Sequence, residues 1–447
     1  MHKVVKIKKL DAVHCKIMDK ESENLLLPVL SYKSYRHFIK KVRYGSRVVK
    51  RHFKTPYVQK LYDGRNKIFL TGFVPRIKEY CTQNEYQLDY ISYDINVQPE
   101  PPQVTGIDFR DYQKDIILSS VEKKRGFVKA PTGSGKTTIF LGIISCFPAF
   151  SVLILCDKVS LLNQLKEEAV KRKINNCEFS TIQSFVNRDP NDYSDYFDMV
   201  IVDECHHLSG MKTMYAKVLE KMLAEYRYGF TATPPKEKAK KYALEGLIGP
   251  MIAEFTEKEA IEKKVISKPK LTLESVEFDL PYMRKYVDFY EQGIINNIKR
   301  NKRIIRIAKR RNRIGKTCLI MVKEIQHGEN LLELANNLNC KFIRGETKSD
   351  TREKIKLAFN DKNIMTIIAT AVWKEGIDIP TLDVVINAIG GKSEIQTLQM
   401  IGRGSRVTED KTQFEIVDFL DSCKYLAEHS IERMKIYNKK GWLTKNV

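Results

Sequence analysis

The sequence predicts an α/β protein in which two parallel-sheet domains in tandem follow a small mixed α+β domain. Short apolar runs recur along most of the chain, each bounded by polar turns, and segments of helical apolar spacing separate them. Runs without polar residues are typical of strands in a parallel sheet that helices cover on both faces. A proline-rich segment, residues 96–103, separates this pattern from the N-terminal region, because clustered prolines interrupt regular structure.

The expected strands fall into two groups along the chain. They are residues 126–130, 152–156, 199–202 and 228–231 in the first tandem domain, and 317–322, 340–344, 365–369, 384–388 and 414–418 in the second. Helical spacing occurs over residues 161–170 and 214–226. In the N-terminal region, residues 67–70 are strand-like and residues 74–81 have helical spacing. We therefore expect domains at residues 1–98, 99–265 and 266–447.

Composition indicates a basic protein without a membrane segment. The chain carries 77 Lys and Arg against 55 Asp and Glu, a formal net charge of +22. This excess favours nucleic acid as a partner, although a basic protein without a polyanionic partner is the alternative. No apolar run reaches the roughly 18 residues of a membrane helix, and the N-terminus lacks the apolar core of a signal peptide. The nine cysteines form no C-x-x-C pair, which favours free thiols in the cytoplasm.

Positive charge is concentrated near the N-terminus. Between Ser31 and Tyr62 the chain has ten Lys or Arg and no acidic residue. Because basic side chains neutralise phosphates, we expect nucleic-acid contacts from Arg43, Arg47, Lys50 and Arg51. The aromatic residues interleaved with them are Tyr32, Tyr35, Phe38, Tyr44, Phe53 and Tyr57. These rings could stack on bases, but strand-like alternation buries one face, so we expect most of them to be core.

Residues 130–138, APTGSGKTT, are the most specific signal in the chain. They follow an expected strand and precede an apolar helical run. Glycines allow backbone N–H groups to close around phosphates, and the start of a helix adds its positive dipole end. Lys136 is expected to reach the β- and γ-phosphates, and the Thr137 hydroxyl to bind Mg²⁺. The expected nucleotide contacts are Pro131, Thr132, Gly133, Ser134, Gly135, Lys136, Thr137 and Thr138.

A second polar stretch, IVDECHHLSG, ends another expected strand. In proteins with such a phosphate loop a carboxylate at a strand end holds Mg²⁺, and Asp203 fits that role. Glu204 can then act as the general base for the attacking water. A zinc site is the weaker alternative, because Cys205, His206 and His207 are contiguous whereas structural zinc ligands come as separated pairs. Cys205 is expected to pack as a small buried residue.

Six motifs in order make the chain similar to superfamily 2 DExH-type helicases. Besides the two described above, the motifs are Asp111–Gln113, Thr231–Pro234, Ala369–Asp378 and Gln399–Arg406. The resemblance covers about residues 105–420 and implies two RecA-like domains with ATP in the cleft between them. It also implies an ATP-dependent DNA helicase activity, with Gln113 reading the adenine.

The resemblance assigns further nucleotide contacts to the last two motifs. Arg403 and Arg406 would reach the γ-phosphate from the second domain, where an arginine supplied across the cleft stabilises the charge that spreads over the transferred group. Gln399 would help to place the attacking water. Gly376 and Asp378 would contact the nucleotide, Asp378 at the ribose.

Coupling and nucleic-acid contacts also come from the resemblance. His206, Thr231 and Thr233 would couple hydrolysis to the grip on DNA. Trp373 could stack on or separate strands, although ordinary packing is the simpler interpretation of a single Trp. The remaining expected nucleic-acid contacts are Thr181, Gln183 and Thr370, with Lys323 and His327 as weaker candidates.

Two departures from the motifs of DEAD-box RNA helicases favour DNA over RNA as the substrate. Residues 155–160 differ from the corresponding element of DEAD-box RNA helicases, and the last motif begins with Gln399 instead of His. Three short N-terminal stretches, Arg43–Gly45, Tyr62–Arg65 and Gly72–Tyr80, resemble those of phage UvsW-type branch-migration helicases. That resemblance implies branched double-stranded DNA as the partner, such as Holliday junctions and forks. If the protein is phage-encoded, its location would be the host cytoplasm.

The sequence thus predicts an ATP- and Mg²⁺-dependent DNA translocase that unwinds or migrates branched DNA, with no obligate protein partner. One alternative is the motor subunit of a nuclease or restriction-type system, which would need a nuclease partner because no PD-(D/E)xK-like cluster is evident. The other is a non-catalytic DNA-binding scaffold. Against the scaffold stand intact candidates for catalysis, Lys136, Asp203, Glu204 and Arg406.

Overall fold

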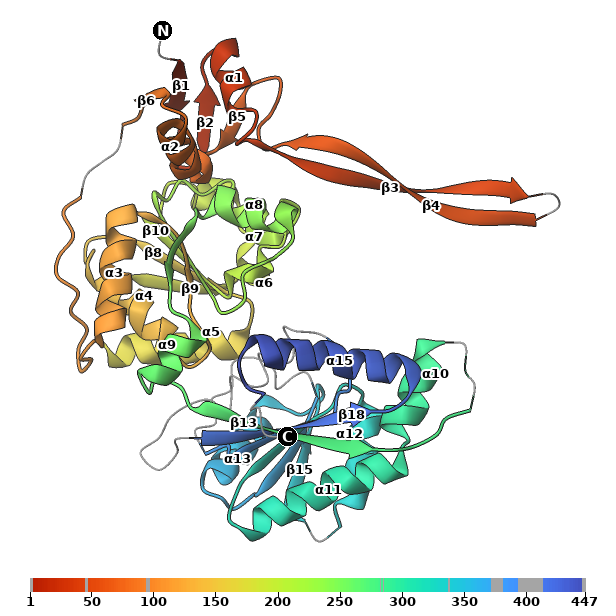
Figure 1. Ribbon diagram of the computed structural model, residues 1–447. Helices are drawn as coiled ribbons and strands as arrows, with labels where there is room; N and C mark the ends of the chain where they lie inside the picture. The colour runs from red at the N-terminus through yellow and green to blue at the C-terminus, as the bar shows by residue number, and fades with distance from the viewer. Residues whose placement is uncertain are drawn as a thin grey trace. The chain divides into compact units, whose positions relative to one another are not determined.

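The computed structural model describes residues 3–44, 47–93, 97–281, 283, 285–336, 338–370, 381–392 and 413–443 of the 447-residue chain. The strands form two six-stranded sheets, one four-stranded sheet and a two-stranded ribbon (Figure 1). The predicted α/β class, with two parallel sheets after a mixed N-terminal sheet, is therefore confirmed. The chain divides into two compact units, one of residues 1–129 and 137–254 and the other of residues 130–136 and 255–447.

The N-terminal four-stranded sheet is mixed. Its order is β5-β2-β1-β6, with β1 parallel to β6 and antiparallel to β2. Its elements are β1 Val4–Lys9, β2 His14–Ile17, α1 Lys20–Leu26, β5 Ile68–Leu70, α2 Val74–Gln83 and β6 Gln87–Ile91. Ile7, Ile17 and Phe69 enter one buried core, because alternate residues of a strand face the same side. The predicted strand at 67–70 and helix at 74–81 are confirmed.

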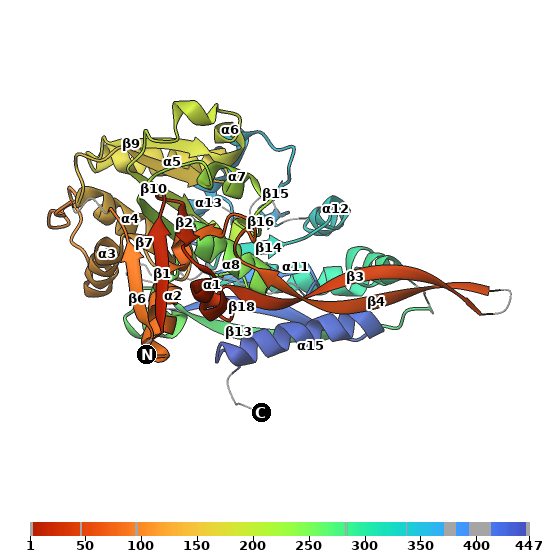
Figure 2. The ribbon, with the colours of Figure 1, turned by 90° about the horizontal axis from the view of Figure 1, so that it is seen from above.

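Strands β3 Ser31–Tyr44 and β4 Arg47–Lys60 form a two-stranded antiparallel ribbon. Figure 1 and Figure 2 both show the ribbon extending away from the four-stranded sheet. The prediction that its aromatic residues are mostly core is wrong, since Tyr35, Phe38 and Phe53 are 48%, 38% and 37% exposed. Alternation does divide the side chains between two faces, but two strands alone have no second layer that could bury either face.

The first six-stranded sheet is entirely parallel, in the order β12-β7-β11-β10-β8-β9. Its strands are β7 Arg125–Lys129, β8 Val152–Cys156, β9 Cys177–Thr181, β10 Met199–Asp203, β11 Tyr226–Thr231 and β12 Met251–Glu254. The helices that precede or connect them are α3 Asp111–Lys123, α4 Lys136–Ser145, α5 Val159–Lys171, α6 Ile182–Phe185, α7 Met214–Leu219 and α8 Lys238–Leu247. Every residue of β8, β10 and β11 is buried, as their apolar runs predict.

The four predicted strands of this sheet are confirmed, but two features differ from the prediction. The edge strands β9 and β12 were not predicted, because their mixed sequences, CEFST and MIAE, lack the continuous apolar run of a central strand. The helix predicted over 214–226 ends at Leu219. Tyr226 belongs to β11 instead, so the helical spacing of apolar residues continues beyond the end of the helix.

The second six-stranded sheet is also parallel, in the order β13-β18-β17-β14-β16-β15. Its strands are β13 Lys268–Val276, β14 Cys318–Met321, β15 Cys340–Ile343, β16 Thr366–Ala369, β17 Val384–Asn387 and β18 Gln413–Asp421. The helices described in this unit are α9 Glu257–Glu262, α10 Tyr286–Tyr290, α11 Ile298–Arg313, α12 Ile325–Leu334, α13 Ser349–Asn360 and α15 Lys424–Lys439. All five predicted strands are confirmed. The edge strand β13 was not predicted, because charged residues interrupt its sequence, KPKLTLESV.

Two buried ion pairs attach helices to the second parallel sheet. Arg300 on α11 donates from Nε to Asp421 Oδ1 at 2.8 Å, and both side chains are fully buried. Arg433 on α15 donates from Nε to Asp418 Oδ2 at 2.8 Å, and the Tyr437 hydroxyl donates to the same oxygen at 2.6 Å. Both aspartates belong to β18, so each pair fixes one helix against that strand. A buried charge that lost its partner would cost several kcal/mol, which makes the pairs sensitive points of the fold.

Buried contacts join the N-terminal domain to the first parallel sheet. The Arg76 guanidinium donates two hydrogen bonds, at 2.6 and 2.5 Å, to the Glu245 carboxylate on α8. A Cβ at Gly72 would lie 2.0 Å from the Glu245 carbonyl oxygen, so only glycine permits this approach. Val13, from the N-terminal domain, belongs to the buried core cluster of the first parallel sheet. The two sheets therefore share packed side chains.

None of the nine cysteines, which all lie in the described ranges, forms a disulfide, and six of them are buried. Across the ranges that the structure describes, no helix combines the length and the apolar character that a membrane crossing requires.

Candidate nucleotide-binding site

Three predicted motifs lie at one edge of the first parallel sheet. Strands β7, β11 and β10 are neighbours, and because they are parallel their carboxyl ends line the same edge. The phosphate loop at 130–135 follows β7, Thr231 ends β11, and Asp203 ends β10. Thr181 ends β9 at the same edge. Ligands of open α/β sheets bind outside the carboxyl ends of the strands, so this edge is the candidate site.

The phosphate loop has the backbone conformation that its glycines allow. Gly133 and Gly135 have φ angles of +84° and +77°. The buried Ser134 hydroxyl donates to the Pro131 carbonyl oxygen at 2.7 Å and closes the loop on itself. Helix α4 begins at Lys136, and the first turn of a helix presents N–H groups and a positive dipole end to an anion. This arrangement suits the terminal phosphates of a nucleotide.

Asp203 and Glu204 form a tight turn at the end of β10. The Asp203 side chain is buried, and its Oδ1 accepts the Glu204 N–H at 2.9 Å. Glu204 has φ 49° and ψ 48°, a left-handed conformation that is uncommon for residues other than glycine. Such strain persists only where the surrounding structure enforces it, and it is typical of functional sites. The turn gives two adjacent carboxylates different environments, because the Glu204 side chain is 26% exposed.

The predicted coupling residues are linked by short contacts. His206 Nδ1 lies 3.0 Å from Thr231 Oγ1 and 3.2 Å from a Glu204 carboxylate oxygen. Thr231 Oγ1 also accepts the Thr233 N–H at 3.1 Å. The proposed general base, the histidine and the two threonines thus form one polar chain between the ends of β10 and β11. Their coupling role remains a prediction. The series of polar contacts would connect the residues that take part in it.

Cys205 is fully buried in the core of the first sheet, as predicted. A Cβ at Gly229 on the neighbouring strand β11 would lie 2.8 Å from Cys205 Sγ, so the absence of a side chain there makes room for the sulfur. His207 Nε2 lies 3.5 Å from Asp157 Oδ2, a contact that the sequence did not indicate. Among the described residues, no group of three or more His, Cys, Asp or Glu side chains is arranged to hold a metal ion.

Gln113 lies in the first turn of α3, before the strand that leads to the phosphate loop. It is buried, and its Oε1 accepts the Arg110 N–H at 3.0 Å. Phe109 and Ile117 pack where a Cβ of Gly142 on α4 would stand, which holds α3 close against the helix that follows the phosphate loop. The reading of the adenine by Gln113 remains a prediction.

The predicted nucleic-acid contacts lie at several strand ends. Thr181 is buried, and its hydroxyl accepts the Ser184 N–H at 3.3 Å as the N-cap of α6, whereas Gln183 is exposed. Thr370 follows β16 and is buried. Lys323 follows β14, and its half-exposed side chain pairs with Glu324 at 2.9 Å. These positions leave Gln183 and Lys323 the more accessible of the four predicted contacts.

His327 is not a nucleic-acid contact, contrary to the expectation from the sequence. Its side chain is fully buried, and Nε2 lies 3.0 Å from Asn301 Oδ1 on α11. Burial, reinforced by the nearby Arg300, lowers the pKa of His327 to about 3, so the ring is neutral at physiological pH. A neutral, buried ring has no charge to offer to phosphates.

Several predicted site residues lie outside the described residues. They are Trp373, Gly376, Asp378, Gln399, Arg403 and Arg406. The side chains of Arg43, Arg47, Lys50 and Arg51 are likewise outside the description, which gives the backbone of their two strands. The contributions of these ten residues remain predictions.

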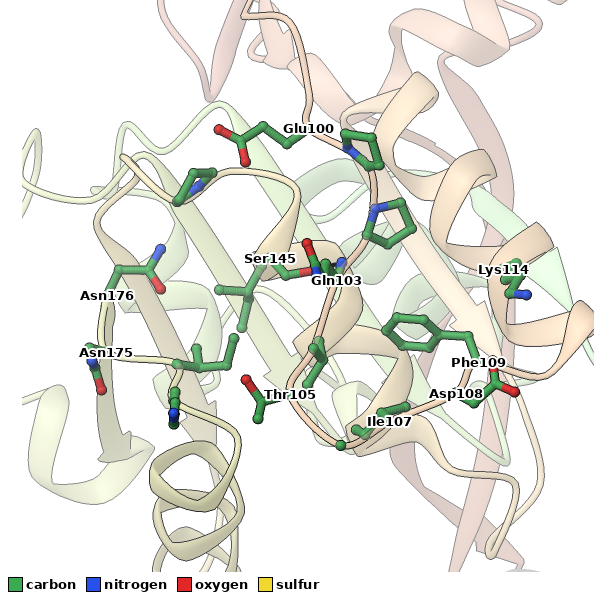
Figure 3. A pocket seen from close by; sticks show the side chains of 18 residues that line it. Glu100, Gln103, Thr105, Ile107, Asp108, Phe109, Lys114, Ser145, Asn175 and Asn176 are labelled. Atoms are coloured by element: carbon green, nitrogen blue, oxygen red, sulfur yellow. Dashed lines mark hydrogen bonds between the residues drawn. The ribbon is translucent and has the colours of Figure 1, made fainter.

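A separate pocket of about 950 Å³ lies at the opposite, amino-terminal edge of the first sheet (Figure 3). The linker residues Glu100–Phe109, the end of α4 at Ser145, and Asn175 and Asn176 before β9 surround it. The phosphate loop and Asp203 follow the carboxyl ends of their strands. The pocket is therefore distinct from the candidate nucleotide site.

A phosphate loop on one parallel sheet, followed by a second parallel sheet, defines the class of RecA-like nucleotide-dependent motors. Two family models match the chain in that order: the res subunit of type III restriction enzymes over residues 106–236, and the helicase conserved C-terminal domain over residues 297–408. The chain belongs to the superfamily 2 ATP-dependent helicases.

Individual proteins that are similar to this chain support the family assignment. The ATP-dependent DNA helicase uvsW of Enterobacteria phage T4 is 24% identical over 84% of this chain and 88% of its own. The DNA 3'-5' translocase XPB2 of Sulfurisphaera tokodaii is 26% identical over 73% of this chain and 84% of its own. A fragment of a putative HsdR subunit of a type I restriction enzyme from Vibrio vulnificus YJ016 shares the fold, with a TM-score of 0.56 at 17% identity over 89% of both chains. The predicted relation to UvsW is confirmed.

Proposed function

We propose that the protein is an ATP- and Mg²⁺-dependent translocase on double-stranded DNA that migrates branches and remodels forks. The observation that carries this proposal is the docking of a basic N-terminal domain on the first motor sheet, through the Arg76–Glu245 pair and the core that contains Val13. An element fixed to one motor domain moves with that domain. Each cycle of ATP hydrolysis can therefore shift the DNA that the N-terminal domain holds.

The charge of the chain supports DNA as the partner. The net charge is +22, and the acid-free segment between Ser31 and Tyr62 coincides with the extended β3–β4 ribbon. Contacts to phosphates position a duplex without reading its bases, which suits a protein that tracks along DNA. The relatives uvsW and XPB2 are described as a DNA helicase and a DNA translocase. The short N-terminal stretches similar to UvsW favour branched DNA.

The chemistry proposed for the site follows from its donors. Lys136 and the phosphate loop hold the terminal phosphates, and Glu204 accepts a proton from the attacking water. Thr137 and Asp203 offer a hydroxyl and a carboxylate, which are the hard oxygen ligands that Mg²⁺ prefers. When bound, the ion would neutralise charge that develops on the phosphate oxygens. Arg403 and Arg406 complete the proposal as donors to the γ-phosphate.

With ATP and Mg²⁺, the protein is expected to resolve a synthetic four-way DNA junction and to leave an RNA duplex of equal arm length intact, as native gels would show. Lys136→Ala is the control, since it removes the ammonium group that binds the phosphates. We expect that variant to lose both junction processing and DNA-stimulated ATPase activity. Dissociation of the RNA but not of the junction would overturn the choice of substrate. Equal ATPase activity in both proteins would overturn the motor assignment.

His206→Ala is expected to lower the DNA-stimulated ATPase rate by about 2- to 10-fold, the effect of one hydrogen bond. Thr231→Val, which removes the partner hydroxyl, should have a similar effect. Because both variants break the same contact, the double variant should lose little more than the worse single variant. ATPase assays with and without junction DNA measure this. Fully additive losses would show that the two residues act independently.

A restriction-type motor is the second candidate function. The match to the type III res model and the fold shared with the HsdR fragment favour it. Such a motor would translocate along linear duplex and displace a third strand from a DNA triplex, yet leave a four-way junction unresolved. The triplex and junction assays together therefore separate the two candidates.

A further inference from the structure

The β3–β4 ribbon is unusually long and exposed for two strands. Each strand has 14 residues, which at about 3.3 Å per residue gives a length of roughly 45 Å. Tyr32 packs against Tyr242 on α8, with ring centroids 5.0 Å apart, and anchors the base of the ribbon. A two-stranded hairpin without further packing is only marginally stable in water. The outer part of the ribbon is therefore suited to a partner that completes its packing.

One face of the ribbon carries a stacked aromatic pair. Phe38 and Phe53 are partners in the strand register, and their rings lie 5.6 Å apart with an interplanar angle of 14°. Alternation places Arg36 and Tyr57 on the same face, where the Arg36 guanidinium lies 4.9 Å from the centre of the Tyr57 ring. This face thus combines a flat apolar surface with a cation held over a ring.

The opposite face has a different composition. Lys54 Nζ lies 4.0 Å from the centre of the Tyr35 ring, and the aliphatic Ile39 and Val58 are each 57% exposed. These two aliphatic residues lie on the same two strands, are more exposed than Phe38 and Phe53, at 38% and 37%, and lack a ring. They therefore supply a control for any experiment on the aromatic pair.

The exposed phenylalanines need an explanation that phosphate binding does not supply. Contacts to phosphates use cations, and Phe38 and Phe53 carry no charge or polar group. A nucleobase offers a flat face for stacking, and aromatic side chains interleaved with cations are the pattern of proteins that bind unpaired bases. In a continuous duplex the neighbouring base pairs cover each other. At a branch point, the last pair of an arm exposes its face.

We infer that the ribbon inserts at the branch point of the DNA, where the Phe38–Phe53 pair stacks on an exposed base pair or unpaired base. Arg36 and Lys54 hold the adjacent phosphates on the two faces. The inference rests on the proposed function, because it takes branched DNA as the substrate. It gives the ribbon the task of keeping the arms apart while the motor domains move the duplex.

The test compares Phe38→Ala/Phe53→Ala with the matched control Ile39→Ala/Val58→Ala in the full-length protein. A four-way junction with 2-aminopurine at the branch point reports stacking through its fluorescence, without ATP. We expect the phenylalanine variant to lose the fluorescence change and to process the junction about 5- to 100-fold more slowly. Its ATPase activity on linear duplex should stay within about twofold of the unaltered protein, which also shows that the variant is folded. The control should behave as the unaltered protein.

A second variant, Phe38→Leu/Phe53→Leu, keeps apolar bulk and removes the flat rings. It should resemble the alanine variant if stacking is the cause, and wild-type behaviour would overturn the inference. Equal fluorescence changes with and without the phenylalanines would also overturn it. A loss of the fluorescence change only in Arg36→Ala/Lys54→Ala would overturn it as well, because that result would place the ribbon in a duplex groove. If the fluorescence changes as expected but ATP drives no junction processing, the stacking role stands and the proposed branch migration fails.

Discussion

Glu204→Gln is expected to bind ATP normally and to hydrolyse it about 10²- to 10⁴-fold more slowly, the contribution of a positioned general base. The amide keeps the size of the carboxylate but cannot accept the proton of the attacking water. Asp203, whose Oδ1 accepts the Glu204 N–H, keeps its backbone contact in the variant. Equilibrium binding of a fluorescent ATP analogue measures the first part of the expectation, and steady-state ATPase with junction DNA measures the second.

Glu245→Gln serves as a control for this experiment, because Glu245 also forms a carboxylate contact but lies on α8 against the N-terminal domain. That variant should retain most of its ATPase activity. Normal turnover in Glu204→Gln would show that another residue activates the water. A parallel loss of ATP binding would show that Glu204 supports the nucleotide and not the chemistry.

Arg300→Met is expected to lower the free energy of unfolding by about 3–5 kcal/mol. Methionine fills much of the space of arginine but leaves the fully buried Asp421 carboxylate without its ion-pair partner. The variant also loses the hydrogen bond from Arg300 Nη1 to Ala388 O, at 3.1 Å. Urea denaturation followed by tryptophan fluorescence measures the effect, since both tryptophans, Trp373 and Trp442, belong to the C-terminal half of the chain.

Two controls define the origin of this loss. Arg303→Met, on the same helix, breaks a partly exposed pair with Glu274 and should cost only about 0–1 kcal/mol. Adding Asp421→Asn to Arg300→Met removes the unpaired charge and should recover part of the stability. A loss under about 1 kcal/mol in the single variant would mean that water reaches Asp421. No recovery in the double variant would assign the loss to packing instead of charge.

The candidate nucleotide-binding edge of the first sheet could be predicted from the sequence because its residues adjoin strand ends. The apolar runs locate β7 and β10, and in a parallel sheet the residue after each run falls on one edge. The phosphate loop and Asp203 can therefore be placed after strand ends without knowledge of the strand order. The order itself, with β11 between β7 and β10, brings Thr231 within 3.0 Å of His206.

The features that the sequence did not predict depend on which residues pack against a side chain in the folded protein. The buried His327 contacts Asn301, on another helix, and His207 contacts Asp157, after another strand. The alternation of β3 correctly indicates a strand with two faces. It carries no information on whether a second layer exists, and in the folded protein Phe38 stays 38% exposed. Local patterns thus specify elements, whereas tertiary partners decide burial.

The contacts of Gly72 and Val13 have a consequence for dissecting this protein. Prolines at 99–102 suggest a natural place to cut between the N-terminal region and the motor. However, Val13 belongs to the core behind the phosphate loop's own sheet, and Gly72 touches the backbone of α8. A fragment that starts after the prolines would lack Val13 and would expose the apolar side chains that pack against it. We therefore expect a stable fragment with the first parallel sheet to include the N-terminal domain.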